Sequence, residues 1–371
     1  MKKYTICILL LLSGTLGAQK VSKAFIAELS ESLDKSAPEL LSKKKVPGMA
    51  IAVIDNGEII YKKGIGFADV ANKTKITLET GFNIGSISKM FTAWGIMKLV
   101  ELGKVDLDVP VEHYLTRWKL PASEFDKNKV TIRSLLSHTG GISVHGYPGF
   151  PPEMKLPSLE ESLNGNNGPV RADEKVEIII EPQTKLQYSG GGFTILQLLI
   201  EEITGKSYAA YMDETIFKPL KMKNTSFKLN QRILKKSAKP YDEKGKEVYL
   251  ERFTAQAAAG LHTTLNDLLI FAKASLYGNK VLTNASLKKM RTPVTLSNGN
   301  YGLGYIVYPF GSVIVRGHAG SNTGWESGFM LDFKHKSGII MLSNGSEGDD
   351  VLKRLLRLWV SWKTTTLKNI D

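Results

Sequence analysis

The chain is nearly free of cysteine. Only Cys7 occurs among its 371 residues, and it lies in an apolar run close to the N-terminus. A lone cysteine in that place forms no intrachain disulfide, and it offers neither a catalytic thiol nor a cysteine-based metal site. No pair of histidines has the spacing typical of metal ligands. The chemistry of this protein must therefore rest on other side chains.

Long apolar runs are also missing. The run at residues 6–12 is too short to span a bilayer. It follows Lys2 and Lys3 and precedes the small residues Leu-Gly-Ala at 16–18, an arrangement typical of a cleavable secretory signal. We expect an exported, periplasmic or secreted protein that begins near Gln19 and has no stable membrane span. Retention by an uncleaved anchor is the alternative.

Acidic residues are the scarcer charged class. Aspartate and glutamate total 36 against 49 lysines and arginines, which gives a formal net charge of +13. The cations are dispersed, and the short runs at residues 43–45 and 235–236 are typical of solvated faces near helix ends. The field of a basic exported protein favours contact with anionic cell-envelope polymers. We expect no nucleic-acid partner, because no reading motif is recognisable.

The most informative feature that is present is Ser86-Ile-Ser-Lys89. Gly85 precedes it, and an apolar-rich helical pattern continues to Leu102, where Gly103 is a suitable helix end. Residues three apart lie on one face of a helix, so the Ser86 hydroxyl and the Lys89 amine can meet at its first turn. A serine becomes nucleophilic when a neighbouring base takes its proton, and a lysine of lowered pKa is such a base. By itself the motif also fits a helix cap followed by a solvated lysine.

The order of the expected helices and strands predicts an α+β fold. The hydrophobic fraction of 42% is sufficient for a large core, and no internal repeat is visible. From periodicity and turn residues we expect a helix (24–41), a hairpin (49–54 and 58–62), helices (86–102, 131–136, 192–203, 208–217 and 264–276), two hairpins (305–308 with 313–316, 329–333 with 338–342) and a closing helix (351–362).

This order predicts an antiparallel sheet built from both chain ends and flanked by helices, with a mainly helical lobe inserted. After a signal at residues 1–18, we expect one domain that spans residues 19–371. Its sheet subdomain comprises about residues 19–80 and 290–371, and its helical subdomain about residues 81–289. The loop at 140–169, rich in glycine and proline, is long enough to indicate a functional edge.

Two other segments carry candidate chemistry. Tyr188 precedes three glycines and a predicted helix, and its phenol can relay a proton if a nearby cation lowers its pKa. The alternative is a packed tyrosine at a flexible helix entrance. His318 lies in Gly-His-Ala-Gly-Ser-Asn at 317–322, where we expect it to face outward at a strand end. The alternative is a hydrogen-bonded structural histidine, which is also how we interpret His138.

With these three motifs in this order, the chain resembles the penicillin-binding-protein and class C β-lactamase superfamily of serine hydrolases, from about Val46 to the last helix. The similarity is to a β-lactamase-related branch of esterases, amidases and D-amino-acid peptidases. Other stretches similar to the family occur at residues 135–141, 259–264 and 301–304. The resemblance implies a β-lactamase/transpeptidase-like fold and an acyl-enzyme mechanism that requires no metal or organic cofactor.

Residue by residue, the resemblance assigns the reaction to few groups. It implies that Ser86 attacks a carbonyl carbon and that Lys89 and Tyr188 share the proton transfers. The oxyanion would lie between the backbone N–H groups of Ser86 and Ser321. The residues that we expect to contact substrate, a small molecule or a peptide, are His318, Gly320, Gly190 and His262.

Two departures from the family pattern bear on specificity. Gly190 stands where the family often has asparagine, and His318 stands where true β-lactamases carry lysine. A histidine is mostly neutral near pH 7, so the cation for a substrate carboxylate is weakened. If protonated His318 replaced the lysine, β-lactam turnover would improve towards pH 6.

These departures favour esters, D-amino-acyl peptides or peptidoglycan-derived peptides over β-lactams. Alternatives within enzymes are a true β-lactamase and a D-Ala-D-Ala carboxypeptidase. The alternative from another class is a catalytically silent envelope-binding protein with the same fold.

Overall fold

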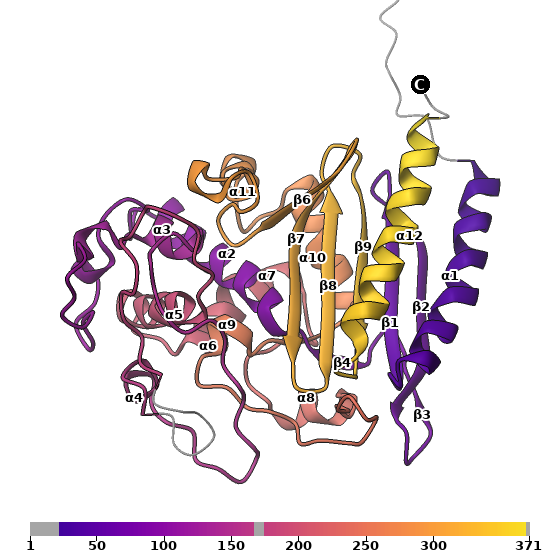
Figure 1. The fold of residues 1–371 in the computed structure, drawn as a ribbon, viewed down its shortest axis with the longest axis horizontal. Helices are drawn as coiled ribbons and strands as arrows, with labels where there is room; N and C mark the ends of the chain where they lie inside the picture. Colours follow the sequence, from indigo (N-terminus) through magenta and orange to yellow (C-terminus); the bar gives the residue numbers. More distant parts are fainter. Residues whose placement is uncertain (1–21, 167–173, 369–371) are drawn as a thin grey trace, which may run out of the picture.

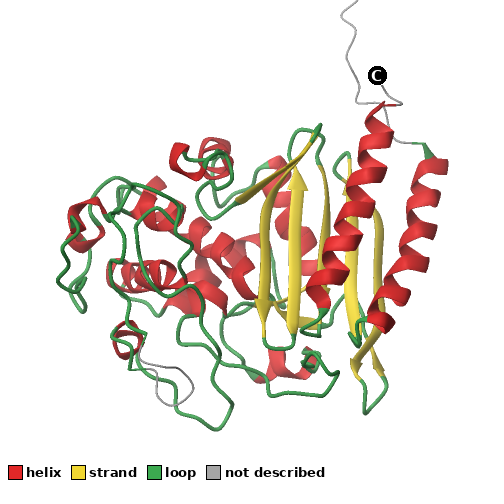
Figure 2. Ribbon diagram, viewed as in Figure 1, coloured by secondary structure: helices red, strands yellow, loops and turns green. Residues whose placement is uncertain are grey.

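A seven-stranded antiparallel sheet forms the centre of the molecule (Figures 1 and 2). The computed structural model describes residues 22–166 and 174–368, so the predicted signal at 1–18 lies outside the described residues. The strand order is β3-β2-β1-β9-β8-β7-β6. The strands are β1 (Gly48–Asp55), β2 (Glu58–Asp69), β3 (Thr74–Lys75), β6 (Ile306–Phe310), β7 (Val313–Asn322), β8 (Trp325–Asp332) and β9 (Ser337–Ser343). Because β1 pairs with β9, both ends of the chain build one sheet, and the predicted fold class is confirmed.

Strand β1 is buried along its whole length. A strand between two neighbours and under two helical layers reads as a continuous apolar run, as residues 49–54 do. Its hairpin with β2 turns at Asn56 and Gly57, whose φ angles of 48° and 82° are the left-handed values typical of an Asn-Gly turn. The predicted hairpin is therefore confirmed.

Two helices from opposite ends of the sequence cover one face of the sheet. α1 (Lys23–Lys43) and α12 (Gly348–Lys368) lie side by side on it (Figure 1). They form an apolar core with the sheet that includes the buried Trp359. Buried Lys363 of α12 is neutralised by Asp55 at the end of β1, with 2.6 Å between Nζ and Oδ1.

The opposite face carries α2 (Ser88–Glu101) and α10 (Leu265–Tyr277), and its core continues into the helical part of the molecule. A short sheet of β4 (Gly81–Asn83) and β5 (His262–Thr264) joins the two parts. The other helices are α3 (Ile132–Leu136), α4 (Leu159–Leu163), α5 (Gly190–Thr204), α6 (Tyr208–Met212), α7 (Lys218–Leu220), α8 (Gln231–Lys236), α9 (Gln256–Ala259) and α11 (Asn284–Arg291). In the part of the chain that the structure describes, no helix has both the length and the apolar character to cross a membrane.

Strand β7 is longer than we predicted. It continues to Asn322 and pairs with β8 as far as Trp325, so His318 lies within the strand opposite Phe329. We expected His318 at a strand end, which is wrong. Residues 317–322 are mostly small or polar, and strand propensity alone does not indicate a central strand there.

Two helix predictions also need correction. α5 begins at Gly190, earlier than expected, because Ser189 caps it with its side chain. The loop at 140–169 is not without structure, since it contains α4, which begins with a capping box formed by Ser158 and Glu161.

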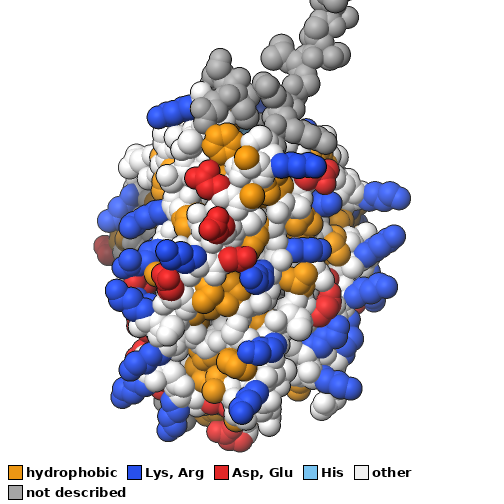
Figure 3. All heavy atoms as spheres, turned by 90° about the vertical axis from the view of Figure 1, so that its right-hand side faces the viewer, with side chains coloured by type: hydrophobic (Ala, Val, Ile, Leu, Met, Phe, Trp, Pro, Cys, Tyr) orange, Lys and Arg blue, Asp and Glu red, His pale blue; other side chains and the backbone are white. Residues whose placement is uncertain are grey.

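Charges are dispersed on the face that α1 borders. Figure 3 shows lysine and arginine side chains interspersed with acidic ones there. Lys63 of β2 and Asp34 of α1 form one such pair, with 2.7 Å between Nζ and Oδ1. This distribution agrees with solvated faces rather than a single basic binding patch.

Candidate active site

The predicted nucleophile lies where two backbone segments meet closely. Ser86 is in a 3₁₀ turn, so the α-helix proper begins at Ser88 and not at Ser86 as expected. Gly85 has a φ of 50°, and a Cβ added to it would lie 2.6 Å from the backbone nitrogen of Ser321 in β7. Only glycine permits this approach. The fold therefore brings Ser86 next to the strand that carries Ser321.

Lys89 lies beside the Ser86 hydroxyl. Its Nζ is 3.0 Å from Ser86 Oγ and donates a hydrogen bond to the Ala258 carbonyl at 2.7 Å. The residue is 1% exposed, and burial lowers the pKa of Lys89 to about 7. A neutral amine is thus available at neutral pH, with a lone pair that can accept the serine proton.

The carbonyl that holds Lys89 belongs to a well-anchored segment. Thr92 Oγ1 donates to the Ala257 carbonyl at 2.9 Å, and Asn322 Nδ2 donates to the Ala259 carbonyl at 3.0 Å. The segment is therefore tied to α2 on one side and to β7 on the other. Such secondary hydrogen bonds fix the direction of the amine towards Ser86.

Tyr188 completes the group around the nucleophile. Lys89 Nζ lies 5.0 Å from the centroid of its ring, and its hydroxyl is hydrogen-bonded with Ser86. Burial raises the pKa of Tyr188 above its ordinary value, and the bond with Ser86 offsets only part of that rise. The sequence suggested a proton relay through Tyr188 on the condition that a nearby cation lowers its pKa, and burial raises that pKa instead. Tyr188 keeps its proton at neutral pH and can act as a donor or a shuttle.

A buried hydrogen-bond chain packs against Tyr188. The His138 ring lies on the Tyr188 ring with 4.2 Å between centroids. His138 Nδ1 accepts a hydrogen bond from the Ser189 backbone at 3.1 Å. Its proton must then lie on Nε2, which donates to the Tyr301 hydroxyl at 3.0 Å. The structural interpretation of His138 agrees with this position.

His318 is the next member of that chain. The Tyr301 hydroxyl donates to His318 Nε2 at 3.1 Å, and His318 Nδ1 donates to the Ala319 carbonyl. Burial lowers the pKa of His318 to about 3. A neutral His318 agrees with the weakened cation that we inferred from the sequence, and the protonated ring on which a gain of β-lactam turnover towards pH 6 depends does not form at that pH. Both ring nitrogens are used within the protein.

Two adjoining cavities open at the nucleophile. The larger has a volume of about 760 Å³ and the smaller about 420 Å³. Ser86, Ser321 and Glu326 line both cavities, and Gly320 and His318 line the larger one. This volume is in the range of small-molecule sites. A substrate carbonyl placed here lies between the hydroxyl of Ser86 and the backbone of Ser321.

Gly190 and His262 lie elsewhere than we predicted. Neither lines these two cavities. A Cβ added to Gly190 would lie 3.3 Å from the Tyr147 ring, so an aromatic side chain fills the space in front of it. His262 is 1% exposed in β5 and packs edge-on against Trp325. The expected substrate contact of both residues disagrees with this placement.

Some residues of the site were missed from the sequence. Tyr301 links the two histidines, and Glu326 accepts a hydrogen bond from the Ser321 hydroxyl at 2.6 Å. Residues 301–304 resemble the family, and this similarity could have pointed to Tyr301 as a residue of the site. Glu326 had none, because its place opposite Ser321 depends on the β7–β8 register.

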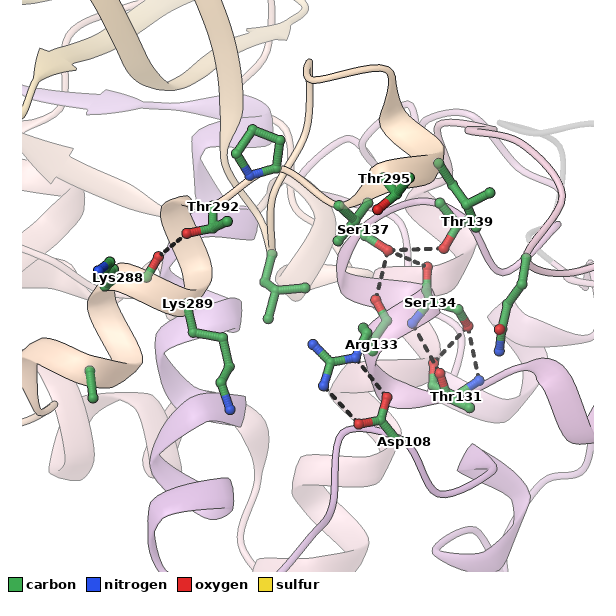
Figure 4. A pocket seen from close by; sticks show the side chains of 16 residues that line it. Asp108, Thr131, Arg133, Ser134, Ser137, Thr139, Lys288, Lys289, Thr292 and Thr295 are labelled. Carbon is green, nitrogen blue, oxygen red and sulfur yellow. Dashed lines mark hydrogen bonds and ion pairs between the residues drawn. The ribbon is translucent and has the colours of Figure 1, made fainter.

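Another cavity, of about 700 Å³, lies between α3 and α11 (Figure 4). It is lined by Arg133 and by hydroxyls such as those of Ser137 and Thr295. Arg133 Nε is already paired with Asp108 Oδ1 at 2.6 Å. No serine next to a buried amine lines this cavity, so we place the active site at Ser86. Within residues 22–166 and 174–368, no cluster of potential ligands is arranged to hold a metal ion.

The state of Lys89 predicts a pH profile. With a pKa of about 7, the neutral fraction of its amine rises from about one tenth at pH 6 to about nine tenths at pH 8. We expect kcat/KM for an uncharged ester to rise about tenfold over that interval. The measurement is the initial rate with nitrophenyl butyrate, corrected for spontaneous hydrolysis at each pH. A decrease of kcat/KM from pH 6 to pH 8 would contradict the assignment of Lys89 as the base.

Known proteins with similar sequences identify the family of this chain. The family described as Beta-lactamase matches residues 24–360. "Protein flp" of Staphylococcus aureus (strain MRSA252) is 27% identical over 322 residues, which cover 85% of this chain and 62% of that protein. The chain thus spans about three fifths of the length of this relative.

Solved structures give the same grouping. The octameric penicillin-binding protein homologue from Pyrococcus abyssi is 30% identical and has a TM-score of 0.71. The match covers 87% of this chain and 74% of the homologue's chain. A class C beta-lactamase has a TM-score of 0.74 at 22% identity, covering 90% and 96%, respectively. The second likeness concerns the fold alone.

Proposed function

This chain belongs to the beta-lactamase family of serine hydrolases, and on that premise we propose that it is an exported hydrolase that cleaves an ester or amide through a covalent acyl-enzyme on Ser86. The observation that carries the proposal is the buried Lys89 amine, 3.0 Å from Ser86 Oγ. A catalytically silent binding protein would have no need to keep an uncompensated lysine in its core, because burial of a charge is costly.

The proposed reaction has two steps. The neutral amine of Lys89 takes the proton of Ser86 as its oxygen attacks the carbonyl carbon, and the backbone N–H groups of Ser86 and Ser321 stabilise the oxyanion. Tyr188 passes a proton to the leaving group as the scissile bond breaks. Water then attacks the acyl-enzyme, with the same groups acting in reverse.

The substrate class is an uncharged or amino-bearing acyl donor rather than a β-lactam. A penicillin carries a ring carboxylate, and His318 offers it no N–H because both ring nitrogens are hydrogen-bonded within the protein. Gly190 offers no side-chain amide. Each missing polar contact costs about 1–3 kcal/mol.

These two losses predict a ranking of substrates. We expect kcat/KM for nitrocefin to lie about two to four orders of magnitude below that for nitrophenyl butyrate. The measurement compares the two substrates side by side, with D-amino-acid amides as a third class. Nitrocefin hydrolysed as efficiently as the ester would contradict the ranking and favour a true β-lactamase.

Export is proposed from the leader at residues 1–18 alone. An exported protein meets small-molecule or peptide substrates of the cell envelope. The net charge of +13 also favours contact with an anionic envelope polymer. We expect mass spectrometry of protein from the native host to find an N-terminus near Gln19. Met1 retained on most molecules would contradict cleavage.

A further inference from the structure

The walls of the catalytic cavities differ in charge from the rest of the protein. The formal net charge of the chain is +13, yet the larger cavity at Ser86 has no lysine or arginine among its lining residues, and the smaller has only Lys89. The carboxylates that line one or both cavities are Glu251, Glu326, Glu347, Asp349 and Asp350. A ligand that enters here meets an environment of the opposite sign to the protein as a whole.

Most of these carboxylates already have partners. Asp349 and Asp350 form ion pairs with Lys353 at 2.6 Å and Lys44 at 2.9 Å, respectively. Glu347 lies 3.6 Å from the same Lys44 amine.

Glu251 has a different kind of partner. It accepts hydrogen bonds from the Gly149 backbone and the Thr323 hydroxyl, at 3.1 Å and 2.8 Å, respectively. It therefore holds two loops together and is not available to a ligand.

Glu326 differs from the others. It lies on β8 opposite Ser321 of β7, and it lines both cavities. Its Oε1 accepts the Ser321 hydroxyl at 2.6 Å, and no cation among the described residues forms an ion pair with it. Glu326 is therefore held beside the proposed oxyanion strand without an ion-pair partner among the described residues.

We propose that Glu326 is a specificity-determining residue that binds a protonated amine of the acyl donor or of its leaving group. This inference rests on the proposed function and identifies its substrate class as cationic. The carboxyl oxygen not used by Ser321 accepts the ammonium hydrogen bond. A substrate carboxylate in the same place would meet repulsion instead.

The protonation state of the Glu326 carboxyl agrees with this assignment. Burial raises the pKa of Glu326 to about 8, with Asp349 and Glu347 adding to the rise and the Ser321 hydroxyl and the Lys353 amine opposing it. A carboxyl group in that condition is mostly neutral at pH 7 and needs a cation in direct contact to ionise. An ammonium group that binds beside Glu326 supplies this cation. The Glu326 carboxyl then releases its proton to solvent and becomes the negative partner of the ammonium group.

The test uses two pairs of substrates that differ in charge at constant shape. The first pair is the 4-nitroanilides of D-alanine and of isobutyric acid, in which NH₃⁺ replaces a methyl group on the acyl side. The second pair is 2-(dimethylamino)ethyl butyrate, whose protonated amine carries an N–H, and 3-methylbutyl butyrate; this pair places the charge on the leaving group. We expect the cation to be preferred in at least one pair, by about 10- to 100-fold in kcat/KM.

Glu326→Gln should reduce that ratio to about threefold or less, because glutamine still accepts the Ser321 hydroxyl but carries no charge. The matched control is Glu347→Gln, which removes a carboxylate from the same cavity next to Lys44 and should keep the ratio. A preference that survives Glu326→Gln, an equal loss in both variants, or no preference for the cation in either pair would overturn the proposal. If none of the four substrates is hydrolysed in a Ser86-dependent way, the proposed function fails instead.

Discussion

Ser86→Ala abolishes turnover of every ester and amide that the wild-type protein hydrolyses; this is the largest effect that we expect. The hydroxyl forms the covalent bond to the acyl group, and it is the serine hydroxyl that lies beside the buried Lys89 amine. Removal of the nucleophile from such a unit costs at least about a thousandfold in kcat. The measurement is kcat with nitrophenyl butyrate, after subtraction of the rate without protein.

The fold should persist in this variant, because Ser86 lies half-buried in a short turn and not in the core. Circular dichroism and the melting temperature serve as checks. Ser361→Ala, an exposed position on α12, is the matched control and should keep full activity. Residual Ser86→Ala turnover above about a few per cent would show that another group is the nucleophile.

Removal of the proton-transfer groups has the second largest effect. Lys89→Met and Tyr188→Phe should each lower kcat about a hundred- to ten-thousand-fold, the usual contribution of a general acid or base. Methionine is chosen because it fills the buried space of the lysine without its amine. The two losses should not multiply in the double variant, since both residues act on the Ser86 proton.

Lys98→Met is the control for this series, because Lys98 lies on the same helix and is partly exposed beside Glu101. It should change kcat little. A double variant whose loss equals the product of the two single losses would show that Lys89 and Tyr188 act independently. Unchanged kcat in Lys89→Met would remove the lysine from the mechanism.

Local patterns in the sequence predicted much of this fold. The Asn-Gly turn at 56–57 requires left-handed backbone, and the structure has it there. The Thr131 cap and the buried strand at 49–54 are likewise consequences of residues near in sequence. The juxtaposition of Ser86 and Lys89 follows from helical spacing, since a separation of three places both on one face.

The electrostatic state of the site could not be predicted in this way. The pKa values of Tyr188 and His318 depend on how much protein covers them, and that cover includes β8, His138 and Tyr301. Pairing across β7 and β8 also places Glu326 beside Ser321, and no local motif specifies that register. Desolvation is a tertiary effect, so sequence patterns gave the residues but not their protonation.

The most direct test of the account is the site of a covalent adduct. The protein is incubated with a fluorophosphonate, digested, and analysed by mass spectrometry alongside Ser86→Ala. We predict one adduct per chain, carried by Ser86, and formed faster as the pH rises through about 7, where the amine of Lys89 loses its proton. An adduct on another serine, or ester hydrolysis without any adduct on Ser86, would contradict the acyl-enzyme mechanism.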